Sequence, residues 1–200
     1  SGIPLSPDAK LTIVGMELRS RALDALRNPD PEEKLALASA IGSEFAILPI
    51  APGPLKEPAG VPGRPVLPRL VEPARVPLRS PHTREGRAAL IHAICHIEFN
   101  AINLALDAVW RFGDMPPAYY HDWSRVAAEE AYHFRILHEH LQGLGFRYGD
   151  FEAHDGLWEM AEKTRHDIVA RMALVPRTLE ARGLDATPLI QARLRKAAEP

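Results

Sequence analysis

The chain has 200 residues, a hydrophobic fraction of 46% and a formal net charge of −2 at pH 7. These values suit one domain with a sizeable apolar core and exclude a general electrostatic attraction to nucleic acid or to anionic membranes. A single cysteine, Cys95, excludes an intrachain disulfide framework, so we expect a protein of a reducing compartment, the cytoplasm. No apolar run approaches the ~20 residues of a membrane-spanning helix, and we expect no membrane partner.

Residues 1–48 are predicted to form an N-terminal helical segment. Two stretches, 6–26 and 30–45, each begin with a capping residue followed by proline: Ser6 with Pro7, and Asp30 with Pro31. A short polar side chain satisfies free N–H groups at a helix start, and proline suits the first helical position. Two helices are therefore expected here.

Residues 49–81 contain ten prolines, which forbid a regular helix and remove the donors that a central strand needs. We call this segment the strap. Four apolar residues alternate with its prolines and predict that the strap is ordered against helices: Val66, Leu67, Leu70 and Val71.

Six arginines on the strap and its downstream edge could meet phosphates: Arg64, Arg69, Arg75, Arg79, Arg84 and Arg87. No aromatic residues interleave them as stacking platforms for bases. A solvated loop wrapped across helices is the favoured interpretation, and nucleic acid is the weaker one.

Residues 82–200 carry helical patterns over 83–112, 116–145 and 154–185, the last of them interrupted at Pro176. A fourth pattern starts at Thr187 and is cut off, and the chain begins without methionine, so we expect a fragment truncated before or within its last bundle helix. No strand alternation is evident. The economical fold is an all-α antiparallel helical bundle.

Glu98 falls within the apolar stripe of the first long pattern, and we predict that it points inward. Ile91, Cys95 and Ile102 belong to that stripe. The opposite side is polar and is predicted to meet solvent; it carries His96, Asn100, Asn103, Asp107 and Arg111.

The second long pattern repeats this anomaly. Glu130 and His133 interrupt a stripe of Trp123, Val126, Ala127, Phe134, Leu137 and Leu141. On the third pattern, Glu180 follows Val169, Met172 and Ala173 along one side.

Buried carboxylates that converge need a proton, a cation or donors to neutralise them. A lone glutamate from each of two helices and a Glu-x-x-His pair from each of two others form a two-metal site in a four-helix bundle. This chain offers Glu98, the pair Glu130 and His133, and Glu180, but lacks a second pair. The alternatives are a core glutamate that pairs with His92 or an arginine, and a satisfied core histidine at position 133. Glu129 is taken as a flanking residue, and His92 and His96 as surface or supporting groups.

The runs "HIEFNAINLALDAVWRFGDMPPAYYHDWSRVAAEEAYHFRILHEHL" and "HDGLWEMAEKTRHDIVARMALVPRTLEARGLD" closely resemble a bacterial family of ferritin-like proteins known as domain of unknown function 455. The resemblance implies a ferritin-like four-helix bundle, distantly similar to the di-iron hydroxylase that modifies tRNA. It also implies metal ligands at Glu98, Glu130, His133 and Glu180. Family members continue into a helix with an Asp-Glu-x-x-His run, which this chain lacks.

The sequence therefore predicts a non-haem carboxylate centre that holds two iron ions, or manganese, in the complete protein. We expect it to oxidise an unidentified small molecule or modified nucleotide with dioxygen. In that hypothesis Glu98 and His133 terminate one metal, Glu130 bridges and Glu180 terminates the other. Iron sequestration without substrate chemistry and a metal-free helical interaction module are the rival hypotheses, and the oligomeric state is left open.

Overall fold

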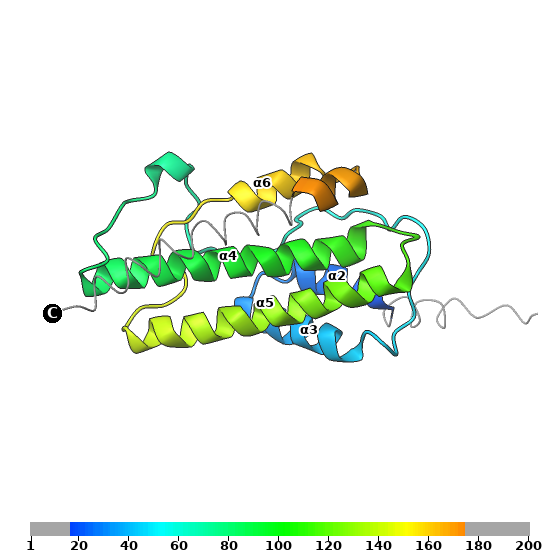
Figure 1. The fold of residues 1–200 in the computed structure, drawn as a ribbon, viewed down its shortest axis with the longest axis horizontal. Coiled ribbons are helices and arrows are strands. Elements are labelled where there is room, and N and C mark those ends of the chain that lie inside the picture. Colours follow the sequence, from blue (N-terminus) through cyan, green and yellow to red (C-terminus); the bar gives the residue numbers. More distant parts are fainter. Residues whose placement is uncertain (1–16, 175–200) are drawn as a thin grey trace, which may run out of the picture. The chain divides into compact units, whose positions relative to one another are not determined.

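The computed structural model describes residues 17–174 of the chain (Figure 1). Regular structure in this range is helical: α2 (Leu18–Arg27), α3 (Pro31–Glu44), the 3-10 helix η1 (Pro73–Arg75), α4 (Arg84–Arg111), α5 (Pro117–Gly143) and α6 (Gly156–Lys163). Within these residues β pairing is limited to an isolated parallel bridge between Leu70 and Ala153. The all-α class is confirmed, whereas the ferritin-like bundle stays a prediction.

The chain divides into two compact units. Among the described residues, unit 1 holds 17–65 and 101–134, and unit 2 holds 66–100 and 135–174. Both boundaries cross helices, α4 and α5, each of which is continuous. The division into 1–48, 49–81 and 82–200 follows composition along the chain and stays a prediction.

The signals at the helix ends act as the sequence predicts wherever the structure describes them. Asp30 caps α3 by accepting a hydrogen bond from the Glu33 N–H at 2.9 Å, and Pro31 occupies the first helical position. Ser6 and Pro7 lie outside the described residues. At the end of α5, Gly145 has φ +82°, a conformation that glycine adopts without a Cβ penalty. Gly145 N–H then bonds the Gln142 carbonyl, and Phe146 N–H bonds the Leu141 carbonyl, which closes the last turn.

Helix α4 is buried on its polar side, which corrects the prediction that this side meets solvent. Asn100, Asn103 and Asp107 are at most 1% exposed, and every residue from 99 to 110 is buried. The polar groups are tolerated because they have partners: Asn103 accepts from Lys34, and Asp107 holds Arg111. Over residues 99–110, α4 therefore has no solvent face for polarity to mark.

The third long helix is shorter than predicted. Helix α6 ends at Lys163, and helical structure resumes over residues 168–174. The break follows Thr164, whose hydroxyl bonds the carbonyl of Met160 at 3.0 Å. The Asp167 carboxylate then accepts from the N–H groups of residues 169 and 170 and caps the new helical stretch. Pro176 and Gly183, the predicted kink and end, lie outside the described residues.

The prediction that the apolar residues of the strap cover helix surface is wrong for three of the four, which are exposed, whereas Val71 is half-buried. Val66 is 96% exposed, Leu67 56% and Leu70 38%. Hydrogen bonds hold the strap instead. Gly63 N–H bonds the Leu26 carbonyl at the end of α2, and Val71 N–H bonds the Ala153 carbonyl.

Arg19 is the main anchor at the start of the strap. Its side chain is fully buried and donates to the strap carbonyls of Ala51 and Gly53 and, twice, to the Trp110 carbonyl in the last turn of α4. The carboxylate of Glu17 accepts from the Ala51 N–H. Donors from α2 therefore satisfy a segment rich in proline.

In unit 2, aromatic side chains and two histidines close the loop after α5 onto α4. His92 is fully buried, and its Nε2 accepts from the Gly149 N–H at 2.9 Å. His96 Nδ1 lies 2.8 Å from the Tyr148 hydroxyl, and its Nε2 lies 3.1 Å from the carbonyl of His154. The same Nε2 also lies 3.0 Å from Asn100 Nδ2. Both histidines are structural, and their assignment to the surface is wrong.

Helix α4 is long and apolar enough to meet a length-and-composition criterion for crossing a membrane, but 67% of the qualifying window is buried inside the protein. The core helix of a soluble protein passes the same test. The cytoplasmic location stays a prediction.

Substitution Arg19→Met is expected to lower the free energy of unfolding by about 3–5 kcal/mol, because it leaves buried carbonyls without donors. The measurement is urea unfolding. Arg21→Met is the matched control: Arg21 also lies on α2, but its ion pair with Glu44 is partly exposed, so its loss costs about 1 kcal/mol or less. Equal losses in the two variants would contradict the anchoring role of Arg19.

Burial lowers the pKa of His92 to about 4. The unfolded chain binds a proton at an ordinary histidine pKa of about 6.5, whereas the folded chain does not until about pH 4. Stability from His92 is thus fully present above about pH 6.5 and is lost as the pH falls toward 4. We expect wild type to lose about 2–3 kcal/mol more between pH 7 and pH 4.5 than His92→Gln. Urea unfolding at both pH values tests this, and parallel losses would refute it.

Candidate metal centre

Glu130 and His133 lie one turn apart on α5 and face each other. His133 Nδ1 is 3.1 Å from Glu130 Oε2, and the side chains are 52% and 24% exposed respectively. A spacing of three residues places two side chains on the same part of a helix surface. This helix therefore presents one oxygen and one nitrogen ligand together.

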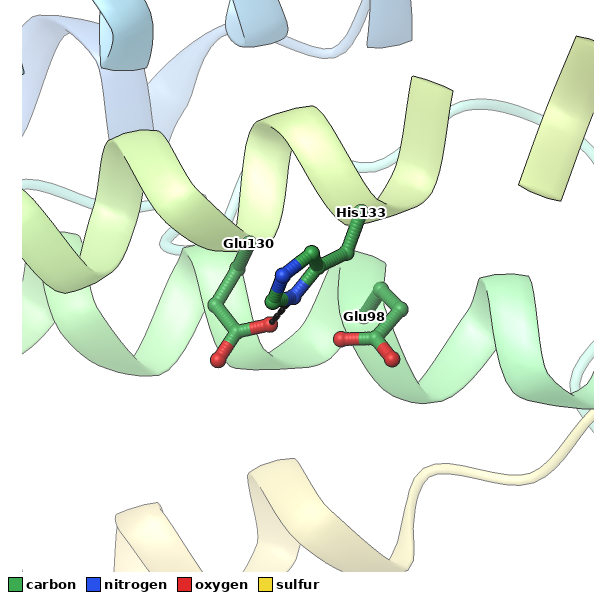
Figure 2. A group of neighbouring side chains, drawn as sticks. All are labelled: Glu98, Glu130 and His133. Carbon is green, nitrogen blue, oxygen red and sulfur yellow. Dashed lines mark hydrogen bonds and ion pairs between the residues drawn. The ribbon is translucent and has the colours of Figure 1, made fainter. Parts of the chain in front are cut away.

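Glu98 on α4 adds a second carboxylate. One ligand atom from each of Glu98, Glu130 and His133 lies within 4.8 Å of the others. Figure 2 shows the three side chains turned toward one another. In residues 17–174 this is the one group of three or more histidine, cysteine or acidic side chains that could hold a metal ion.

The spacing of the three groups fits one transition-metal ion. Bonds of about 2.1 Å place neighbouring ligands of an octahedral ion about 3.0 Å apart and opposite ligands about 4.2 Å apart. The 3.1 Å between Glu130 and His133 already matches neighbouring ligands. The outer limit of 4.8 Å exceeds the opposite-ligand distance by about 0.6 Å, an adjustment within reach of glutamate side-chain torsions.

The three groups are less buried than the sequence predicts. Glu98 and Glu130 are half-buried and His133 is exposed. The buried residues of α5 are Tyr120, Ser124, Ala127, Ala131, Phe134 and Leu141, and positions 130 and 133 flank that line. The apolar stripe predicted from the sequence points to one side of the true buried line. It includes three residues that are only half-buried: Trp123, Val126 and Leu137.

The fourth predicted ligand, Glu180, lies outside the described residues. Glu129 is exposed, in agreement with a flanking role. Cys95 is fully buried one turn before Glu98, and burial, together with the charge of Glu98, raises the pKa of its thiol to about 12. The thiol is therefore protonated at neutral pH and is a poor ligand.

The arginines on the strap and its edge make contacts within the protein. Arg69 pairs with Glu152 at 3.0 Å, and Arg79 pairs with Glu85 at 3.1 Å. Arg84 donates to the Leu144 carbonyl, and Arg87 to the carbonyl of His82. These contacts account for four of the six arginines by intramolecular bonds, and none of the four requires a phosphate.

Sequence reasoning missed the buried polar groups that hold the strap. Arg19 and Lys34 are both fully buried. A signal existed for Lys34, which stands in the apolar series with Leu35, Ala38 and Ile41 on α3. No pattern marked Arg19, because its acceptors are backbone carbonyls far along the chain.

Residues 27–200 match the family described as "Protein of unknown function (DUF455)". A protein of Haemophilus influenzae (strain ATCC 51907 / DSM 11121 / KW20 / Rd), called "Uncharacterized protein", is 61% identical over 137 residues. That alignment covers 65% of this chain and 48% of the relative, so the chain spans about half the relative's length. No solved structure matches.

The match covers nearly all of the described helices, including both that carry Glu98, Glu130 and His133. The chain thus belongs to the DUF455 family of proteins of unknown function.

Proposed function

We propose that Glu98, Glu130 and His133 bind a divalent transition-metal ion. The observation that carries this proposal is the convergence of their ligand atoms within 4.8 Å. Two carboxylates offset the charge of a divalent cation, and a neutral imidazole adds a nitrogen ligand. Three protein ligands leave coordination positions for water or a substrate.

Iron and manganese are the ions that this ligand set suits best. Mixed carboxylate and imidazole ligands are typical of these metals, whereas thiolate-rich sites select zinc or copper. The nearest thiol, that of Cys95, is buried and protonated.

The finer proposal is a di-metal carboxylate centre in an oxygen-dependent oxidoreductase. A Glu-x-x-His pair on α5 together with a lone glutamate on α4 supports it, because these are half of the ligands that such centres use. Glu180 and a second Glu-x-x-His pair are the proposed remainder. Bound iron supplies the reduction of dioxygen, and the glutamates hold the ions and balance their charge. An unidentified small molecule or modified nucleotide is the proposed substrate.

Iron binding without substrate chemistry is the second candidate. The 52% exposure of the His133 side chain favours it, since an ion there could exchange with solvent. Dioxygen uptake by the longer relative from Haemophilus influenzae distinguishes the enzyme from the iron-storage protein. A storage protein consumes a fixed amount of dioxygen per ferrous ion, whereas an enzyme with reductant and substrate continues to turn over.

The metal proposal predicts that this chain binds manganous ion and that Glu130→Ala and His133→Ala each weaken the affinity at least tenfold, because each removes one of three ligands. Loss of the electron paramagnetic resonance signal of free Mn²⁺ measures the bound fraction. His140→Ala is the matched control: His140 is an exposed histidine on the same helix and outside the group of three. Unchanged affinity in both ligand variants, or no binding by wild type at millimolar Mn²⁺, would disprove the proposal.

Metal binding is also expected to weaken as the pH falls from 7.5 to 5, because protons compete for the carboxylates and the imidazole. Thermal melting under anaerobic conditions with ferrous or manganous ion gives the readout. A hundredfold excess over Kd stabilises the folded state by about 2.7 kcal/mol, and this increment should shrink at pH 5. A shift that is identical at the two pH values would indicate binding elsewhere.

A further inference from the structure

The ammonium group of Lys34 lies in a cage of three oxygen atoms. Lys34 is on α3 and is fully buried. Its Nζ lies 3.1 Å from the Leu26 carbonyl, 2.8 Å from the Gly63 carbonyl and 2.6 Å from Asn103 Oδ1. The cage therefore joins α3 to the end of α2, to the strap and to α4.

The cage matches the charged form of the lysine. An ammonium carries three donors and no acceptor, and three acceptors surround it. Burial and, to a smaller extent, the positive charge of Arg64 nevertheless lower the pKa of Lys34 to about 7. Charged and neutral forms are thus both populated near neutral pH.

A neutral amine does not fit the same cage. It has two donors and one lone pair, so one of the three oxygens would face the lone pair. Two of these oxygens are backbone carbonyls and cannot become donors. The third belongs to the amide of Asn103, whose Nδ2 is buried and has no hydrogen-bond partner among the described residues.

We propose that Lys34 and Asn103 form a proton-operated switch beneath the strap. In the charged state, Lys34 donates to all three oxygens. In the neutral state, the Asn103 amide turns over and its Nδ2 donates to the lone pair of the amine, while Lys34 keeps its bonds to Leu26 and Gly63. One proton is released to solvent, and no covalent bond changes.

The strap leaves little freedom for any other response. A Cβ added at Gly63 would lie 1.9 Å from the Arg27 carbonyl oxygen, so the backbone there is pressed against the end of α2. Gly63 N–H also bonds the Leu26 carbonyl at 2.9 Å. The amide of Asn103 is therefore the group that changes from hydrogen-bond acceptor to hydrogen-bond donor.

Each element that packs against Lys34 contributes charged or dipolar groups near the switch. The C-terminal carbonyls of α2 favour the ammonium, and Arg64 on the strap opposes it. On α4 the nearest ionised residue in the helical register is Asp107, which is bound to Arg111. On α3 the acidic neighbour Glu33 bonds the Asn28 side chain.

The switch is tested by nuclear magnetic resonance of the isotope-labelled 200-residue chain between pH 5.5 and 9.5. The Cε and Nζ signals of Lys34 report its protonation, and the side-chain amide signals of Asn103 report the turn of the amide. We expect Lys34 to titrate with a midpoint near pH 7 and the Asn103 amide signals to shift with the same midpoint.

Two outcomes would overturn the switch: a Lys34 midpoint above pH 9, or Asn103 amide signals that stay fixed while Lys34 titrates. Asn103→Asp gives a further test, because a carboxylate only accepts and is negative, so the Lys34 midpoint should rise by at least one pH unit. An unchanged midpoint in this variant would also reject the switch. If Asn103→Asp does not fold, the wild-type titration decides alone.

Discussion

A proline-rich segment has carbonyl oxygens to satisfy but few N–H groups of its own, and in this protein two buried basic side chains supply the missing donors. Arg19 bonds the strap carbonyls of Ala51 and Gly53, and Lys34 bonds that of Gly63. Burying a cation is costly unless acceptors surround it. The strap carbonyls are those acceptors, so they offset the cost of burying the basic side chains. The basic side chains in turn offset the cost of burying carbonyls without hydrogen bonds. This exchange explains how a segment with exposed Val66 and Leu67 is nevertheless held in one place.

The same two basic side chains also bond α4. Lys34 bonds Asn103, and Arg19 bonds the Trp110 carbonyl near the end of α4. These groups turn the polar side of the helix into an interior surface. The most exposed side chains of α4 in its middle are instead Ala93 and Ile97. Glu98 adjoins this edge, which is why it is half-buried rather than enclosed.

Much of the fold could be predicted because its signals are local. The proline after Asp30 and the glycines that follow α4 and α5 act within a few residues of the helix ends that they mark. The predictions from the sequence were wrong where a structural feature depends on a contact with a residue distant in the sequence. The amphipathic pattern identified two sides of α4, but it could not reveal that Asn103 on the polar side meets Lys34, which is more than 60 residues away in the sequence. The break before Asp167 contains no proline or glycine to mark it, and the bond between Thr164 and buried Arg171 is not visible in the sequence.

In the candidate site, too, local features could be predicted from the sequence and features that depend on distant contacts could not. Helical spacing alone brings Glu130 and His133 together, whereas their exposure depends on which neighbours of α5 are truly core. Half-exposure changes the energetics of a metal site. Fully buried carboxylates pay a large desolvation cost without a cation, and such a site is strained when empty. Here solvent screens the carboxylates, and the exposed pair of Glu130 and His133 contributes about 1 kcal/mol or less to stability. The fold therefore does not depend on a cation at these residues, and so weak a pair would offer little resistance to the proposed metal ion.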